Sequence, residues 1–134
     1  MKTEILFQAI AFFFVLLTFR TVYKNYSNLP EKIPMHIGPD GKADSWWLKN
    51  HGTAYILSYI SLLIWVVLLF LSVVLFEKSK WHFAFNAVGI AFLLYYFQVG
   101  FIKYTLTKIK NMGLYILIGL MVFGLSFILA ELMD

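Results

Sequence analysis

Residues 54–76 read AYILSYISLLIWVVLLFLSVVLF, and no charged side chain interrupts this run. An α-helix needs about 20 predominantly apolar residues to cross the hydrocarbon core of a bilayer. The run therefore predicts a membrane-spanning helix, and it is the strongest such segment in the chain. Thr53, directly after Gly52, is a candidate N-cap for this helix.

Three further apolar runs predict helices over about 5–23, 82–102 and 112–130. Arg20 lies near the end of the first run, where a long side chain can reach the membrane interface. A signal peptide is the alternative for this run, but Glu4 stands where a positive charge belongs and no small-residue cleavage site follows Phe19. We therefore expect a retained helix.

These runs predict the fold class and the domain organisation. We expect an all-α membrane protein, with residues 1–134 forming a single integral membrane domain. It would be a bundle of four transmembrane helices with one structured loop, 24–52, between the first two.

The composition supports a membrane protein and excludes several other classes. Hydrophobic residues make up 61% of the chain and charged residues 13%, whereas soluble domains average about 25% charged residues. The absence of cysteine excludes disulfides and thiolate metal sites. The net charge of +4 is spread between the apolar runs, which favours the lipid bilayer over nucleic acid as a partner. We expect a multi-pass protein of the cell's cytoplasmic membrane.

The distribution of lysine and arginine predicts the orientation. Four crossings place both termini on one side of the membrane. Eight of the basic residues fall on the other side, with the long loop. By the positive-inside rule the loop 24–52 would be cytoplasmic. These eight residues are Arg20, Lys24, Lys32, Lys42, Lys49, Lys103, Lys108 and Lys110.

The run 82–102 carries small and amide residues on two nearly opposite faces. Small residues allow helices to approach closely, and amides can hydrogen-bond across a contact. We therefore expect this helix to lie between neighbours, and we favour packing over a transport pathway because no Asp, Glu, Lys or Arg lies mid-span in the last three helices. The predicted packing residues are Ala87, Ala91 and Gln98 on one face and Asn86, Gly89 and Gly100 on the other.

Residues 29–44 hold all three prolines and three of the seven acidic residues. Apolar residues alternate over 33–37, which predicts an extended strand. Pro39-Asp40-Gly41 predicts a turn. We expect Asp44 or Ser45 to cap a short helical turn that carries Trp46 and Trp47. These two indoles, and Trp81 before the third run, would anchor the protein at the interface.

The loop also carries a motif, Leu-Pro-x-x-Ile-Pro-x-His followed by Gly, Asp and Lys. It resembles the signature of a small bacterial membrane domain of uncharacterised function, which also forms the N-terminal part of immunity proteins against the sporulation-delaying toxin. Ile37 stands where that family usually has Phe. The resemblance covers the first helix, the loop and the start of the second helix. The matching residues are Leu29, Pro30, Ile33, Pro34, His36, Gly41, Asp44 and Lys49.

His36, Asp40 and Asp44 offer an imidazole and carboxylates, which suit Zn or Mn. Their spacing matches no established ligand pattern, so we favour turn-stabilising hydrogen bonds over a metal site. No nucleophile or zincin motif accompanies His36. We expect neither an enzyme nor a cofactor.

The leading functional hypothesis is a membrane module, resembling toxin-immunity proteins, that binds a peptide toxin or a membrane-protein partner. The loop 29–49 would make the contact, and the module could form a homo-oligomer. The alternative is a structural or accessory subunit of a larger membrane complex. A carrier or pore is disfavoured by the missing intramembrane charge. The predicted binding residues are Leu29, Pro30, Ile33, Pro34, His36, Asp40, Gly41, Asp44 and Lys49.

Overall fold

A computed structural model of the chain describes residues 3–75 and 80–132. Within these ranges four helices are long and apolar enough to cross a membrane. This confirms the predicted all-α membrane protein with four transmembrane helices. The four spans are Thr3–Asn28, Ile56–Val74, His82–Thr105 and Gly113–Leu132. They correspond to α1 (Thr3–Asn25), α3 (Ile56–Phe70) with the turn that follows it, α4 (Lys80–Thr105) and α5 (Gly113–Leu132).

The strongest apolar run does not form one continuous helix. Its first residue ends a short helix, α2 (His51–Ala54), and α3 begins after a break at Tyr55. Asn50, not Thr53, is the N-cap: its side chain accepts a hydrogen bond from the backbone N–H of Thr53. The Thr53 hydroxyl accepts one in return from the backbone N–H of Asn50, which completes a capping box. After α3 the helix widens into a π-helical turn, η2 (Leu71–Leu75).

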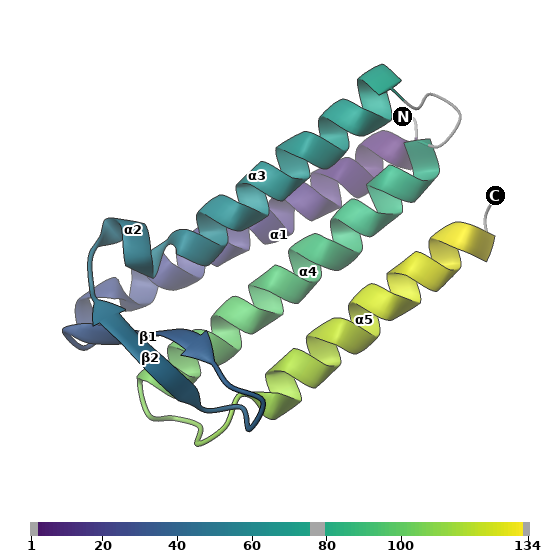
Figure 1. The fold of residues 1–134 in the computed structure, drawn as a ribbon. Coiled ribbons are helices and arrows are strands. Elements are labelled where there is room, and N and C mark those ends of the chain that lie inside the picture. Colours follow the sequence, from purple (N-terminus) through teal and green to yellow (C-terminus); the bar gives the residue numbers. More distant parts are fainter. Residues whose placement is uncertain (1–2, 76–79, 133–134) are drawn as a thin grey trace.

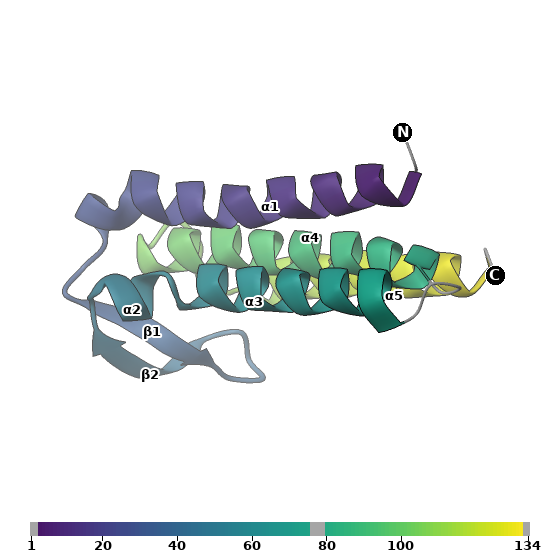
Figure 2. The same ribbon diagram turned by 90° about the horizontal axis from the view of Figure 1, so that it is seen from above.

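Helix α4 lies at the centre of the bundle. In Figure 1 it runs between α5 on one side and the pair α1 and α3 on the other. Figure 2 shows the same arrangement from above, with α1 and α3 on different faces of α4. Among the described residues, α4 is the principal helix neighbour of α5.

The two faces of α4 meet different helices. Ala87 and Ala91 are buried in an apolar cluster with Ala11 and Val15 of α1. On the other face, α5 approaches so closely that a Cβ atom on Gly89 would lie 1.9 Å from the Ser126 hydroxyl. Gly100 is likewise covered by the ring of Tyr115, whose Cγ would lie 2.6 Å from a Cβ atom on Gly100. Small residues on both faces thus allow α4 to sit in the middle. The side chain of Asn86 is half-buried, and that of Gln98 is fully buried.

The predicted loop folds into a small hairpin at the end of the bundle opposite the described chain ends (Figure 1). A short 3₁₀ turn, η1 (Tyr26–Asn28), follows α1. Strands β1 (Lys32–Ile37) and β2 (Ala43–Leu48) then pair antiparallel, with a bulge between Pro34 and His36. The expected helical turn at Trp46 and Trp47 is wrong. Both residues lie in β2 and pair with Pro34 and Ile33, consistent with the high strand propensity of tryptophan.

Candidate functional site

The hairpin turn is built from the residues that the sequence marked as a turn. The backbone N–H of Gly38 donates to the carbonyl of Lys42 (2.8 Å), and that of Gly41 donates to the carbonyl of Gly38 (2.9 Å). The Asp40 carboxylate accepts from the backbone N–H of Lys42 (3.1 Å). Gly41 has a φ of +75°, a conformation that favours glycine. The turn is therefore ordered by its own hydrogen bonds.

Three contacts join the tip of the hairpin to the last turn of α4 and the connector that leads to α5. The backbone N–H of Met112 donates to the carbonyl of Gly41 (2.9 Å). The side-chain amide of Asn111 donates to the carbonyl of Asp40. The hydroxyl of Tyr104 accepts from the backbone N–H of Ala43 (2.9 Å). A Cβ on Gly41 would lie 2.2 Å from the Asn111 side chain, so glycine is also required by the close approach.

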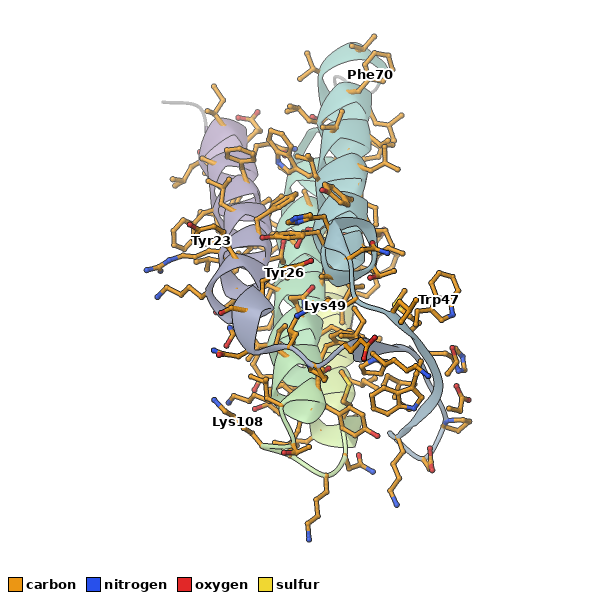
Figure 3. The ribbon with its side chains drawn as sticks, turned by 90° about the vertical axis from the view of Figure 1, so that its left-hand side faces the viewer. Tyr23, Tyr26, Trp47, Lys49, Phe70 and Lys108 are labelled. Carbon is orange, nitrogen blue, oxygen red and sulfur yellow. The ribbon has the colours of Figure 1, made fainter. Side chains whose placement is uncertain are left out.

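Lys49 holds the base of the hairpin. Its ammonium group donates to the carbonyl of Leu29 (2.8 Å) and lies 3.4 Å from that of Tyr26. It also lies 5.1 Å from the centre of the Tyr26 ring, within range of a cation–π contact. Figure 3 shows Lys49 and Tyr26 on facing segments. Tyr26 in turn stacks on His51 of α2.

Apolar residues fix the base of the hairpin onto the helices. Ile33 is fully buried with Val22 of α1, Ala54 of α2 and Ile102 of α4. Tyr55 packs against the same cluster. Burial raises the pKa of the Tyr55 hydroxyl above its ordinary value, and the neighbouring tyrosines add to the effect. This phenol is therefore neutral at physiological pH.

The middle of the hairpin exposes a polar pair. His36 Nδ1 lies 2.6 Å from the Asp44 carboxylate, and both side chains are more than half exposed. Among the described residues no group of three His, Cys, Asp or Glu side chains comes together to hold a metal ion. Asp44 pairs with the imidazole and Asp40 closes the turn, so each of the three side chains named as candidate ligands has a protein partner.

The predicted motif residues divide into two groups. Leu29, Ile33, Pro34 and Gly41 are buried and Lys49 is half-buried, so these residues hold the hairpin in place. Pro30, His36, Asp40 and Asp44 are exposed and can meet a partner. Tyr104, Asn111 and Met112, which bond to the tip of the hairpin, were not predicted. Nothing local in the sequence indicates that they contact a hairpin so distant along the chain.

The predicted interface anchors are exposed on β2. Trp46 and Trp47 are 47% and 56% exposed, and the next residue, Leu48, is 59% exposed. Trp46 stacks loosely on Tyr104. Figure 3 shows Trp47 pointing away from the helices. The side chain of Trp81 lies outside the described part of the structure.

A cleft of about 320 Å³ lies beneath the hairpin. β1 forms its roof, and its walls come from the start of α3, the last turns of α4 and Ile116 of α5. Most of the lining is apolar, with Leu57, Phe97 and Phe101 prominent. His36, Ile37 and Ile116 also line a second space, of about 580 Å³, that extends to the tip of the hairpin. The apolar lining of the cleft thus ends at His36, one member of the exposed polar pair.

Comparison with known families covers this part of the chain. Residues 13–62 match the model of a domain of unknown function, DUF1648. The matched region runs from α1 through the hairpin into α3 and contains every residue of the motif. No curated protein and no solved structure matches the chain significantly.

Proposed function

We propose that the protein is a non-enzymatic membrane module that binds an apolar peptide segment through the hairpin and the cleft beneath it. The observation that carries the proposal is the cleft, because most of its lining is apolar and the exposed His36 borders it. Ligand sites in proteins commonly combine apolar walls with a few placed polar groups.

The chemistry of the rim suggests the character of the ligand. Apolar side chains of a peptide would fill the space between Leu57, Phe101 and Ile116. The Asp40 carboxylate is exposed in the adjoining space and would accept a hydrogen bond from a donor on the peptide. The resemblance to toxin-immunity proteins implies a partner of the same kind, a hydrophobic or cationic peptide.

Binding of a defined probe tests the proposal. The protein is reconstituted in lipid nanodiscs, and a fluorescent apolar peptide with lysines at one end is titrated by anisotropy. Ile116→Trp fills the cleft and is expected to weaken binding at least tenfold. The control, Leu114→Trp, changes an exposed residue of the same helix that lines neither space. Binding no stronger than to empty nanodiscs, or equal losses in both variants, would contradict the proposal.

A second candidate function is supported by a different surface. An apolar groove of about 210 Å³ runs along α4 between α1 and α5, with Phe85, Val88 and Val122 in its lining. Such a groove could receive a helix of a larger membrane complex. Purification in mild detergent distinguishes the two functions. A subunit should retain partners in fixed stoichiometry, whereas a binding module should be isolated alone or as a homo-oligomer.

A further inference from the structure

The contact between α1, α3 and α4 contains two apolar clusters at different depths. The cluster nearer the hairpin includes Val22, Ala54 and Ile102. The deeper cluster includes Val15 and Ala91, with Leu62 of α3 packed against it. Helices α1 and α4 each pass from one cluster to the other, and α2 and α3 together do so across the break at Tyr55. The residues between the two clusters therefore share one layer of the bundle interior.

Polar side chains occupy this layer on all three helices. Thr18 and Gln98 lie one helical turn deeper than Val22 and Ile102, and so on the same faces of α1 and α4. Ser58 lies in the first turn of α3, between Ala54 of the cluster nearer the hairpin and Leu62 beside the deeper cluster. Ser61 follows on the next turn of α3. All four are buried, with exposures of 0%, 0%, 1% and 2% for Thr18, Ser58, Gln98 and Ser61.

Most of the polar atoms in the layer have no protein partner. The hydroxyl of Thr18 donates to the carbonyl of Val15 (2.7 Å). In the part of the chain that the structure describes, both side-chain polar atoms of Gln98 and the hydroxyls of Ser58 and Ser61 are buried without a hydrogen bond. An amide can donate two hydrogen bonds and accept two, and a hydroxyl can do both. Buried polar groups almost always find a partner, so these atoms point to a ligand.

We propose that this polar layer is a binding site for water molecules that bridge Gln98 to Ser58 and Ser61. The layer combines donors and acceptors, and water satisfies both, whereas a cation satisfies only acceptors. A cation here would also lack a counter-charge, since the spans of α3, α4 and α5 carry no mid-span acid. The site is independent of the proposed peptide binding.

Selective labelling allows a direct test, because Gln8 and Gln98 are the two glutamines of the chain. The protein is labelled with ¹⁵N in glutamine side chains and in alanine and is reconstituted in bilayers. Gln98→Leu identifies the Gln98 signal, and Ala91→Gly identifies that of Ala91. Water-edited solid-state NMR then measures magnetisation transfer from water. We expect rapid transfer to the Gln98 amide, although it is 1% exposed, and slow transfer to the backbone amide of Ala91 in the apolar cluster.

A paired variant tests whether the water bridges the helices. Ser58→Ala with Ser61→Ala should reduce the transfer to Gln98 at least twofold, and the control Ser126→Ala, on α5 with its hydroxyl bonded to the carbonyl of Phe123, should not. The measurement on the unaltered chain needs no variant to fold. Transfer to Gln98 as slow as to Ala91 would overturn the water site. Transfer that is unaffected by the paired variant would overturn the bridge.

Discussion

At the scale of single residues, Lys49 is a charged side chain that stabilises the fold. Its ammonium group bonds to the carbonyl of Leu29, just after the 3₁₀ turn, and lies near the carbonyl and over the ring of Tyr26, the first residue of that turn. The sequence places Lys49 in the motif, but its role could not be predicted. Its partners Tyr26 and Leu29 lie 23 and 20 residues earlier in the chain and become neighbours only because the hairpin folds back. His36 and Asp44 were predicted to lie in one ordered loop, and their direct pairing emerges from the strand register.

Replacing Lys49 with methionine tests this role. The substitution keeps the length of the side chain but leaves the carbonyl of Leu29 without its donor. Because hydrogen bonds to charged groups contribute more than neutral ones, we expect the free energy of unfolding to fall by about 1–3 kcal/mol. Unfolding in mixed detergent micelles, followed by circular dichroism, measures the change. Lys42→Met alters an exposed lysine of the same hairpin and should have little effect. Equal effects in both variants would contradict the assigned role.

At the scale of elements, the long helices were predictable and the hairpin only in part. The bilayer fixes the length of a membrane helix, so uninterrupted apolar runs identify α1, α3, α4 and α5. Alternating apolar residues predicted the extended course of β1. The second strand was missed because Asp44 was interpreted as a helix cap, whereas its carboxylate pairs with His36 across the hairpin. The walls of the cleft come from three distant helices, and no local pattern could reveal them.

Engineered disulfides test the register of the hairpin. Lys32 lies directly opposite Leu48, while Trp47 lies opposite Ile33. Side chains that face one another across an antiparallel pair share a face, and neighbours along a strand do not. The pair Lys32→Cys with Leu48→Cys should therefore oxidise readily, and Lys32→Cys with Trp47→Cys should not. The natural chain has no cysteine, so a gel-shift assay with a maleimide polymer has no background. Equal oxidation of both pairs would exclude this register.

At the scale of the whole molecule, the ends of the bundle differ in charge. The hairpin end gathers the end of α1, the hairpin, the last turn of α4 and the connector between α4 and α5 (Figure 1). Eight of the eleven basic residues belong to these segments. Lysine and arginine near helix ends are retained on the cytoplasmic side of membranes. This distribution favours a hairpin that faces the cytoplasm.

Labelling of single cysteines in cells tests this orientation. Lys42→Cys places a thiol on the exposed hairpin, and Thr3→Cys places one at the exposed start of α1, at the other end of the bundle. A membrane-impermeant maleimide should label Thr3→Cys in intact spheroplasts and Lys42→Cys only after permeabilisation. The opposite pattern would reverse the orientation, and with it the side from which a ligand reaches the cleft.

The hydrogen bond from Met112 to Gly41 has a mechanical consequence. It ties the tip of the hairpin to the residue immediately before α5, a helix whose principal neighbour is α4. A ligand that lifts the hairpin therefore pulls directly on the first turn of α5. The hairpin and the start of α5 therefore have to move together unless this bond breaks.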